Sequence, residues 1–121
     1  MPKVLVIEDE PSIVMILREF LTDQGYEVCA EYNGKAGLKR LNELPLPDAV
    51  IIDLNMPGIG GKEVIKHMRS CEELKNIPVI ITTGNAYSPG DFPSKGSYQA
   101  VVEKPFELFD MLNVIKRITL T

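Results

Sequence analysis

The fold depends most on one stretch near the middle of the chain, Pro47-Asp48-Ala49-Val50-Ile51-Ile52-Asp53-Leu54-Asn55-Met56-Pro57-Gly58. Its apolar run, Ala49 to Ile52, is too short for a helix and rich in β-branched residues, which is typical of a strand buried on both faces of a parallel sheet. The run ends at a carboxylate, Asp53, and a loop begins within a few residues. Ligands of open α/β sheets bind at this end of the strands. An aspartate here can also simply cap the following loop, so its role depends on its neighbours.

The composition of the chain is that of a globular protein. Its 121 residues have the size of one domain, and we predict a single domain over residues 1–121. The formal net charge of −4 provides no basic surface for nucleic acid or for a membrane. The sequence shows neither a signal peptide nor an apolar run of membrane-spanning length, so we expect a cytoplasmic location. Because the sequence stops soon after its last predicted helix, we expect either a stand-alone domain or a part of a larger regulator.

Strand and helix patterns alternate along the chain. Short apolar runs predict strands at Lys3–Ile7, Tyr26–Tyr32, Ala49–Ile52, Ile77–Ile81 and Ala100–Val102. Helical spacing of apolar residues predicts helices from Pro11 to the Gln24-Gly25 stop, over Lys35–Leu44, after Gly60-Gly61 and over Leu108–Ile118. Repeated strand–helix units require right-handed crossover connections and a parallel sheet.

Polar side chains follow four of the predicted strands, namely Glu8 and Asp9, Asp53, Thr83 and Lys104. In a parallel sheet these strand ends lie at one edge. Carboxylates about 4 Å apart repel one another by several kcal/mol at an intermediate dielectric, so folding would raise their pKa values or recruit a cation. Oxygen ligands without His or Cys favour Mg²⁺, which completes its shell with water and phosphate. The sequence therefore predicts a magnesium site at this edge.

The same side chains suit the transfer of a phosphoryl group to a carboxylate. Asp53 would attack phosphorus and form an acyl phosphate, while Mg²⁺ and Lys104 neutralise the developing charge. The hydroxyl of Thr83 would donate to a phosphoryl oxygen. Each residue alone is weak evidence for phosphoryl transfer, but the occurrence of all of them on four strand ends in this order is strong evidence for it.

These residues, together with Lys104-Pro105, resemble those of a response-regulator receiver domain of two-component signalling, and the resemblance covers nearly the whole chain. It implies a flavodoxin-like, doubly wound, five-stranded parallel sheet in the order 2-1-3-4-5. It also implies that Asp53 is the phosphoacceptor, that Thr83 is the switch hydroxyl, and that the backbone carbonyl of Asn55 joins Glu8, Asp9 and Asp53 around Mg²⁺. The peptide bond before Pro105 is usually cis in this family.

The resemblance also implies the partners of the chain. A phosphohistidine of a sensor histidine kinase or phosphotransfer protein would donate the phosphoryl group, water would later remove it, and an unknown downstream protein would bind the changed surface. The chain would then be a phosphoacceptor and not an enzyme with a separate substrate. Two alternatives stay open: a docking module that works without phosphorylation, and an Asp-nucleophile phosphatase. Such phosphatases generally carry a second acid two residues after the nucleophile, where this sequence has Asn55.

Three features depart from the family pattern. Glu8 replaces the commoner aspartate, and Val101 stands where the family usually has a Tyr or Phe that swings inward with the switch hydroxyl. The segment Gly84–Ser97, which should hold the family's fourth helix, contains two prolines and three glycines, so we expect that helix to be short or irregular. We therefore expect phosphorylation to be read out on Gly84–Ser97, and Phe109 of the last helix to belong to the partner surface.

Overall fold

The computed structural model describes residues 1–84, 90 and 92–119. In this part of the chain the strands are β1 (Lys3–Ile7), β2 (Glu27–Glu31), β3 (Ala49–Asp53), β4 (Val79–Thr83) and β5 (Ala100–Glu103). The helices are α1 (Pro11–Asp23), α2 (Gly34–Arg40), α3 (Gly61–Ser70) and α4 (Leu108–Thr119). None of these helices is long and apolar enough to cross a lipid bilayer.

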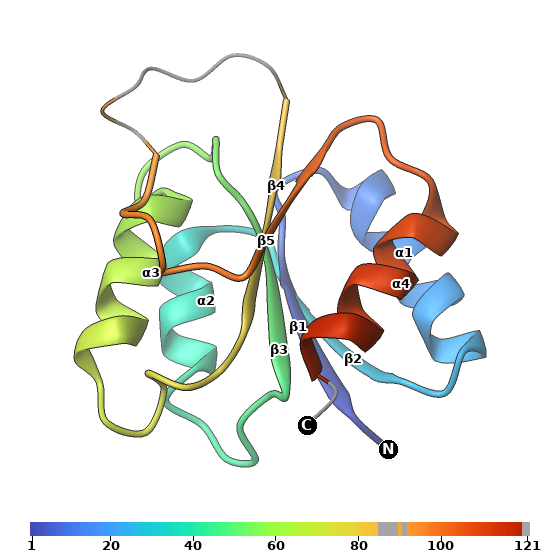
Figure 1. The fold of residues 1–121 in the computed structure, drawn as a ribbon, viewed down its shortest axis with the longest axis horizontal. Helices are drawn as coiled ribbons and strands as arrows, with labels where there is room; N and C mark the ends of the chain where they lie inside the picture. Colours follow the sequence, from blue (N-terminus) through green and yellow to red (C-terminus); the bar gives the residue numbers. More distant parts are fainter. Residues whose placement is uncertain (85–89, 91, 120–121) are drawn as a thin grey trace.

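The strands form one parallel sheet in the order β2-β1-β3-β4-β5. Figure 1 shows this sheet edge-on, with α2 and α3 on one side and α1 and α4 on the other. This arrangement is the flavodoxin-like, doubly wound fold and the strand order that the sequence predicted. Because helices cover both faces of the sheet, its central strands are apolar along their whole length.

The core consists of two hydrophobic clusters, one on each face of the sheet. Successive side chains of a strand point to opposite faces, so each strand contributes to both clusters. The cluster on the side of α2 and α3 contains, among others, Leu5, Ile7, Val50, Ile52, Val79 and Ile81. The cluster on the side of α1 and α4 contains, among others, Val4, Val6, Ile51, Ile80, Leu17 and Met111. This alternation determines which polar side chains share a face where the strands end.

Helix α2 is shorter than predicted. The sequence pattern predicted a helix over Lys35–Leu44, whereas the structure ends the helix at Arg40 and continues in turns. The side chain of Asn33 accepts a hydrogen bond of 2.8 Å from the Ala36 N–H and so defines the start of the helix. Helical backbone is disfavoured just before a proline, and Pro45 and Pro47 follow closely.

The segment Gly84–Ser97 was predicted to hold a short or irregular helix. Residues 85–89 and 91 lie outside the described residues, so this prediction is tested only in part. The described residues 92–97 form turns and bends and include no helix. Here Phe92 packs edge-on against Tyr98 with ring centroids 5.4 Å apart, and both rings contact the core cluster beside α2 and α3.

Candidate functional site

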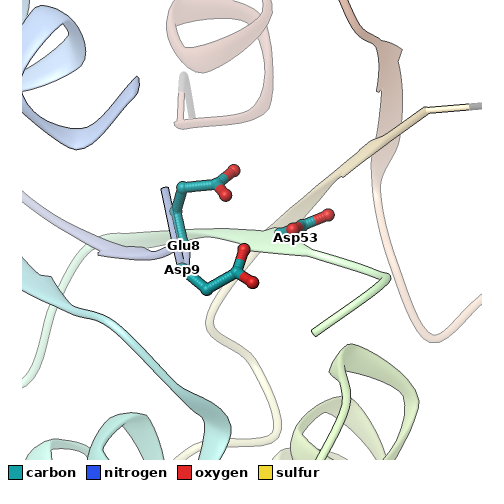
Figure 2. Close-up of side chains that lie close together, drawn as sticks. All are labelled: Glu8, Asp9 and Asp53. Carbon is teal, nitrogen blue, oxygen red and sulfur yellow. The ribbon is translucent and has the colours of Figure 1, made fainter. Parts of the chain in front are cut away.

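Three carboxylates meet at the carboxyl end of the sheet. Glu8 and Asp9 directly follow β1, and Asp53 is the last residue of the neighbouring strand β3. One side-chain oxygen from each lies within 4.8 Å of the others. Figure 2 shows the three side chains close together. Glu8 and Asp53 are buried, whereas Asp9 is not. The structure thus brings together the acidic cluster that the strand ends predicted.

Lys104 supplies a positive charge to this cluster. Its Nζ lies 2.8 Å from Oε1 of Glu8 and 3.4 Å from Oδ2 of Asp53. The lysine follows the last residue of β5, and its backbone N–H donates to the carbonyl oxygen of Thr83 on β4 at 2.8 Å. The Lys104–Pro105 peptide bond is cis, as the resemblance implied. The ammonium group therefore lies between the two buried carboxylates.

Burial dominates the electrostatics of the site. It raises the pKa of Glu8 to about 7, and the negative charge of Asp53 adds to this, while the hydrogen bond from Lys104 opposes it. Burial also raises the pKa of Asp53 above its ordinary value, against the opposing charge of Lys104. For Lys104, burial lowers the pKa, but its contacts with Glu8 and Asp53 together outweigh burial and leave the pKa raised. Bringing these acids together therefore has an electrostatic cost that a cation would reduce.

Asn55 and Thr83, the remaining predicted residues, lie beside the cluster in different ways. The backbone N–H of Asn55 donates to Oδ1 of Asp53 at 3.2 Å, so the loop after β3 folds back on the carboxylate. Thr83 is buried at the end of β4, and its hydroxyl donates to the carbonyl oxygen of Gly84 at 2.7 Å. In this structure the hydroxyl of Thr83 thus bonds to the backbone of the next residue.

Close packing between backbones holds the loop between β3 and α3. Gly34, the first residue of α2, lies so near the loop that an added Cβ would overlap the carbonyl oxygen of Ile59. At Gly61 an added Cβ would come within 3.0 Å of the carbonyl oxygen of Asp53. Gly58 has a φ of 77°, which favours glycine. Glycines therefore allow the loop that carries Asn55 to lie tightly between α2 and α3.

The donor set of the site suits a hard cation. Glu8, Asp9 and Asp53 offer only carboxylate oxygens, which Mg²⁺ prefers. Glu8 is the more closely engaged of the two buried acids, because its Oε1 lies 2.8 Å from Lys104 Nζ, against 3.4 Å for Oδ2 of Asp53, and its Oε2 accepts from the N–H of Glu10 at 3.2 Å. Asp9 and Asp53 are therefore the best placed to bind a metal directly, and Glu8 is better placed to do so through water.

Two residues singled out in the sequence, Val101 and Phe109, are both exposed. Val101 on β5 is 41% exposed, and the nearest aromatic residue in sequence, Tyr98, packs against the core on the side of α2 and α3. Phe109 on α4 is 64% exposed and touches the edge of Phe20 on α1, with centroids 5.0 Å apart. The exposure of Phe109 is compatible with the predicted partner surface.

Thr82 was not among the predicted site residues. It reads as the end of an apolar run, yet its side chain is buried, and its Oγ1 has no hydrogen-bond partner among the described residues. It pairs in register with Asp53 of β3. Aligning the ends of the two predicted strands was the one signal in the sequence that would have placed this hydroxyl beside Asp53.

Comparisons with known proteins agree with this geometry. The polar-differentiation response regulator DivK of Brucella anthropi is 32% identical over 119 residues, covering 96% of this chain and 95% of DivK. The transcriptional regulatory protein AfsQ1 of Streptomyces coelicolor is 40% identical over 83 residues, covering 69% of this chain but 35% of AfsQ1. The crystal structure of the response regulator TrrA from Thermotoga maritima, in complex with Mg²⁺-BeF, aligns with a TM-score of 0.82 and 34% identity, covering 98% of this chain and 99% of TrrA.

The family comparison covers most of the chain. The sequence model of the response regulator receiver domain matches residues 4–116, a range that contains the polar residues at the strand ends and, except for Lys3, the strands β1 to β5. Receiver domains generally bind Mg²⁺ at an acidic pocket and interact with histidine kinases or phosphotransfer proteins and with downstream effectors. On this match, and on the similarity to DivK over nearly its full length, the chain belongs to the response regulator receiver domain family.

Proposed function

We propose that the chain is a signalling switch controlled by phosphorylation of Asp53. A phosphohistidine on a sensor histidine kinase or phosphotransfer protein donates the phosphoryl group, and the modified domain presents a changed surface to a downstream protein. One observation carries this proposal: Asp53 is buried at the end of the central strand, with Lys104 Nζ 3.4 Å away and Asp9 in the same oxygen cluster. A structural aspartate capping a loop needs neither neighbour.

Each residue has a defined part in the reaction. A carboxylate oxygen of Asp53 attacks phosphorus, the bond from phosphorus to the histidine nitrogen breaks, and the electron pair leaves with the imidazole. Lys104 is a positive point charge that offsets the charge on the phosphoryl oxygens. The hydroxyl of Thr83 gives up its hydrogen bond to the carbonyl of Gly84 and donates to the phosphoryl group instead. Water later hydrolyses the acyl phosphate and returns Asp53 to a carboxylate.

A magnesium ion held by Asp9, Asp53, the carbonyl of Asn55 and, through water, Glu8 would supply charge neutralisation for the phosphoryl group. This chain's own contribution is to gather the carboxylates and to hold Lys104 beside them. The Mg²⁺-BeF complex of TrrA, a relative with 34% identity, supports the proposal. We expect weak binding in the absence of a phosphoryl group, because only part of the ligand shell comes from the protein.

Phosphoryl uptake can be measured with acetyl phosphate as the donor. Incubation with Mg²⁺ followed by intact-mass measurement should show one added phosphoryl group, and Asp53→Asn should show none. The variant should melt at the same temperature or higher in metal-free buffer, because the amide removes a charge from a repelling cluster. Uptake by Asp53→Asn equal to that of the unmodified chain would contradict the proposal.

The same measurement separates the alternatives. The exposed Val101, in place of the family's moving aromatic, favours a docking module that works without phosphorylation, and this alternative predicts no mass gain. An Asp-nucleophile phosphatase predicts steady phosphate release without accumulation. We therefore propose that the chain is a phosphoacceptor and not an enzyme with a separate substrate, for which a lasting mass gain is the expected result.

Metal binding has its own test. Titrating Mg²⁺ while following backbone amide chemical shifts should move the signals of Glu8, Asp9, Asp53 and Asn55. Signals that stay unchanged at millimolar metal would rule out the metal site.

A further inference from the structure

Thr82 is a buried threonine whose hydroxyl lacks a partner. Its side chain is 2% exposed, and Oγ1 forms no hydrogen bond with any group in the described part of the chain. Buried hydroxyls are nearly always hydrogen-bonded, and leaving one unpaired costs stability. Valine has almost the same shape and would fill this place without that cost, so the hydroxyl requires an explanation.

The register of the sheet places Thr82 next to Asp53. The two residues are paired across β3 and β4, and paired residues of neighbouring parallel strands point to the same face. Two residues earlier, Ile51 and Ile80 both belong to the core cluster beside α1 and α4. By strand alternation, Asp53 and Thr82 therefore share that face.

The position of the Lys104 side chain also indicates that Thr82 lies beside Asp53. Its Nζ reaches Glu8, which follows β1, although Lys104 follows β5, and neighbouring strands lie about 4.8 Å apart. To reach Glu8 and Asp53, the side chain must cross β4. On the face concerned, the last side chain of β4 is that of Thr82, and Gly84, which follows β4, has no side chain. Thr82 is thus the side chain of β4 that lies beneath the lysine and beside the reacting carboxylate.

Thr83 occupies the opposite face of β4. Ile81, two residues before it, belongs to the core cluster beside α2 and α3, and the hydroxyl of Thr83 donates to the carbonyl of Gly84. The two adjacent threonines therefore approach the site from different faces of the sheet, and Thr82 does not duplicate the switch hydroxyl.

We propose that the Thr82 hydroxyl donates a hydrogen bond to the acyl phosphate formed on Asp53, from the β4 side of the site. This inference rests on the proposed phosphorylation of Asp53. In the unmodified protein, Oδ1 of Asp53 accepts from the N–H of Asn55 and Oδ2 faces Lys104. Phosphorylation adds three acceptor oxygens. Rotation about the Cα–Cβ bond of Thr82 then brings its unpaired donor to an acceptor on the neighbouring strand.

The test compares Thr82→Val with Thr82→Ser, because the first removes only the hydroxyl and the second keeps it. The probe is acetyl phosphate with Mg²⁺: an Asp53 oxygen bonds to phosphorus, the bond from phosphorus to acetate breaks, and acetate leaves with the electron pair. We expect Thr82→Val to take up the phosphoryl group about tenfold more slowly, the scale of one hydrogen bond in a buried site. Thr82→Ser should stay within about twofold of the unmodified chain.

Thermal unfolding of the unphosphorylated proteins separates this role from a structural one. Thr82→Val should be at least as stable as the unmodified chain, because an apolar group replaces an unpaired hydroxyl. Uptake by Thr82→Val at the rate of the unmodified chain would overturn the inference, and so would equal slowing in Thr82→Ser. If the unmodified chain itself took up no phosphoryl group, the proposed function would fail, and the role of Thr82 would fail with it.

Discussion

Glu8 has two roles in the structure, and they oppose each other. Its carboxylate forms the shortest ion pair of the site, 2.8 Å from Lys104 Nζ, and it also adds a negative group to the cluster that contains Asp9 and Asp53. Removing a carboxylate from water costs more free energy than a single ion pair provides. Burial accordingly raises the pKa of Glu8 to about 7. The same residue thus holds the lysine in place and makes the metal-free site sensitive to pH.

The free energy of unfolding of the metal-free protein should fall as the pH rises from 4.5 to 7. The ordinary pKa of Glu8 is 4.5, so between these values the folded chain holds a proton that the unfolded chain has lost. The stability from this group is therefore complete below pH 4.5 and is lost as the pH rises through about 7. We expect Glu8 to account for about 3 kcal/mol. Urea unfolding followed by circular dichroism at several pH values measures this.

Glu8→Gln is the matched control for that measurement. The amide keeps the shape of the side chain but does not titrate, so the fall in stability between pH 4.5 and 7 should flatten. Added Mg²⁺ should also reduce the fall, because a cation stabilises the ionised carboxylates. A pH profile that is identical in Glu8→Gln would show that another group is responsible.

At the scale of elements, α2 lies against the functional loop as well as against the sheet. Gly37 faces the side chain of Ile7 on β1, where an added Cβ would lie 2.5 Å from Cδ1, the flexible end of that side chain. Gly34, one turn earlier, faces the backbone of Ile59 in the loop that also carries Asn55. The first contact can adjust by rotating a side chain, whereas the second cannot.

Gly34→Ala should therefore weaken Mg²⁺ binding more than Gly37→Ala does. The added methyl group at Gly34 must push the loop after β3 outward, which displaces Asn55, and such overpacking costs about 1–3 kcal/mol of stability. Gly37→Ala adds the same atom to the same helix and should leave the metal affinity nearly unchanged. Amide-shift titration with Mg²⁺ gives both affinities. Equal affinities in the two variants would show that α2 does not position the loop.

Sequence patterns predicted the elements and most of the site because both depend on local order. Apolar runs that end in Glu8, Asp53 and Lys104 are visible in the sequence, and the parallel sheet brings such ends to one edge. Features that depend on the pairing of elements distant in the sequence were not predicted. The unpaired hydroxyl of Thr82 and the contact between Gly34 and Ile59 follow from register and packing, which no local pattern reports.

At the scale of the whole molecule, the residues of the functional site and an arginine that stabilises the fold lie at opposite ends of the sheet. The acids and Lys104 lie where the strands end, whereas Arg69 of α3 binds the chain where β4 and β5 begin. Arg69 donates to the carbonyl oxygens of Ser97 at 2.8 Å, Lys75 at 2.9 Å and Ile77 at 3.0 Å. One side chain thus connects α3 to the segments that precede both strands.

Arg69→Met should lower stability without slowing phosphoryl uptake. Several backbone carbonyls lose a charged donor, and we expect a loss of about 3 kcal/mol in the free energy of unfolding. Arg40→Met is the comparison, because Arg40 pairs with Glu31 at the surface at 2.7 Å, and such pairs contribute about 0–1 kcal/mol. Urea unfolding gives both values, and acetyl phosphate uptake below the unfolding transition gives the rates. Slower uptake in Arg69→Met would show that the two ends of the sheet are coupled.

The route from Asp53 to the partner surface should begin at Thr83. When Thr83 turns toward the phosphoryl group, it releases the carbonyl of Gly84. In the described part of the chain beyond Gly84, Lys62 of α3 donates to the carbonyl of Gly90 at 2.5 Å and Arg69 of α3 donates to that of Ser97 at 2.8 Å. Val101 has only a stiff, β-branched side chain and no ring to move inward. The change should therefore pass into the segment between β4 and β5 and not into β5 itself.

Hydrogen exchange with and without Mg²⁺ and beryllium fluoride, a phosphoryl mimic, measures this route. We expect altered protection at Gly84 and across residues 92–99, with β5 little changed, because the mimic repositions the hydroxyl that holds the start of the segment. Asp53→Asn should show none of these changes, since the mimic binds that carboxylate. Changes confined to α1, with residues 92–99 unaffected, would mean that the signal leaves the site on the other face of the sheet.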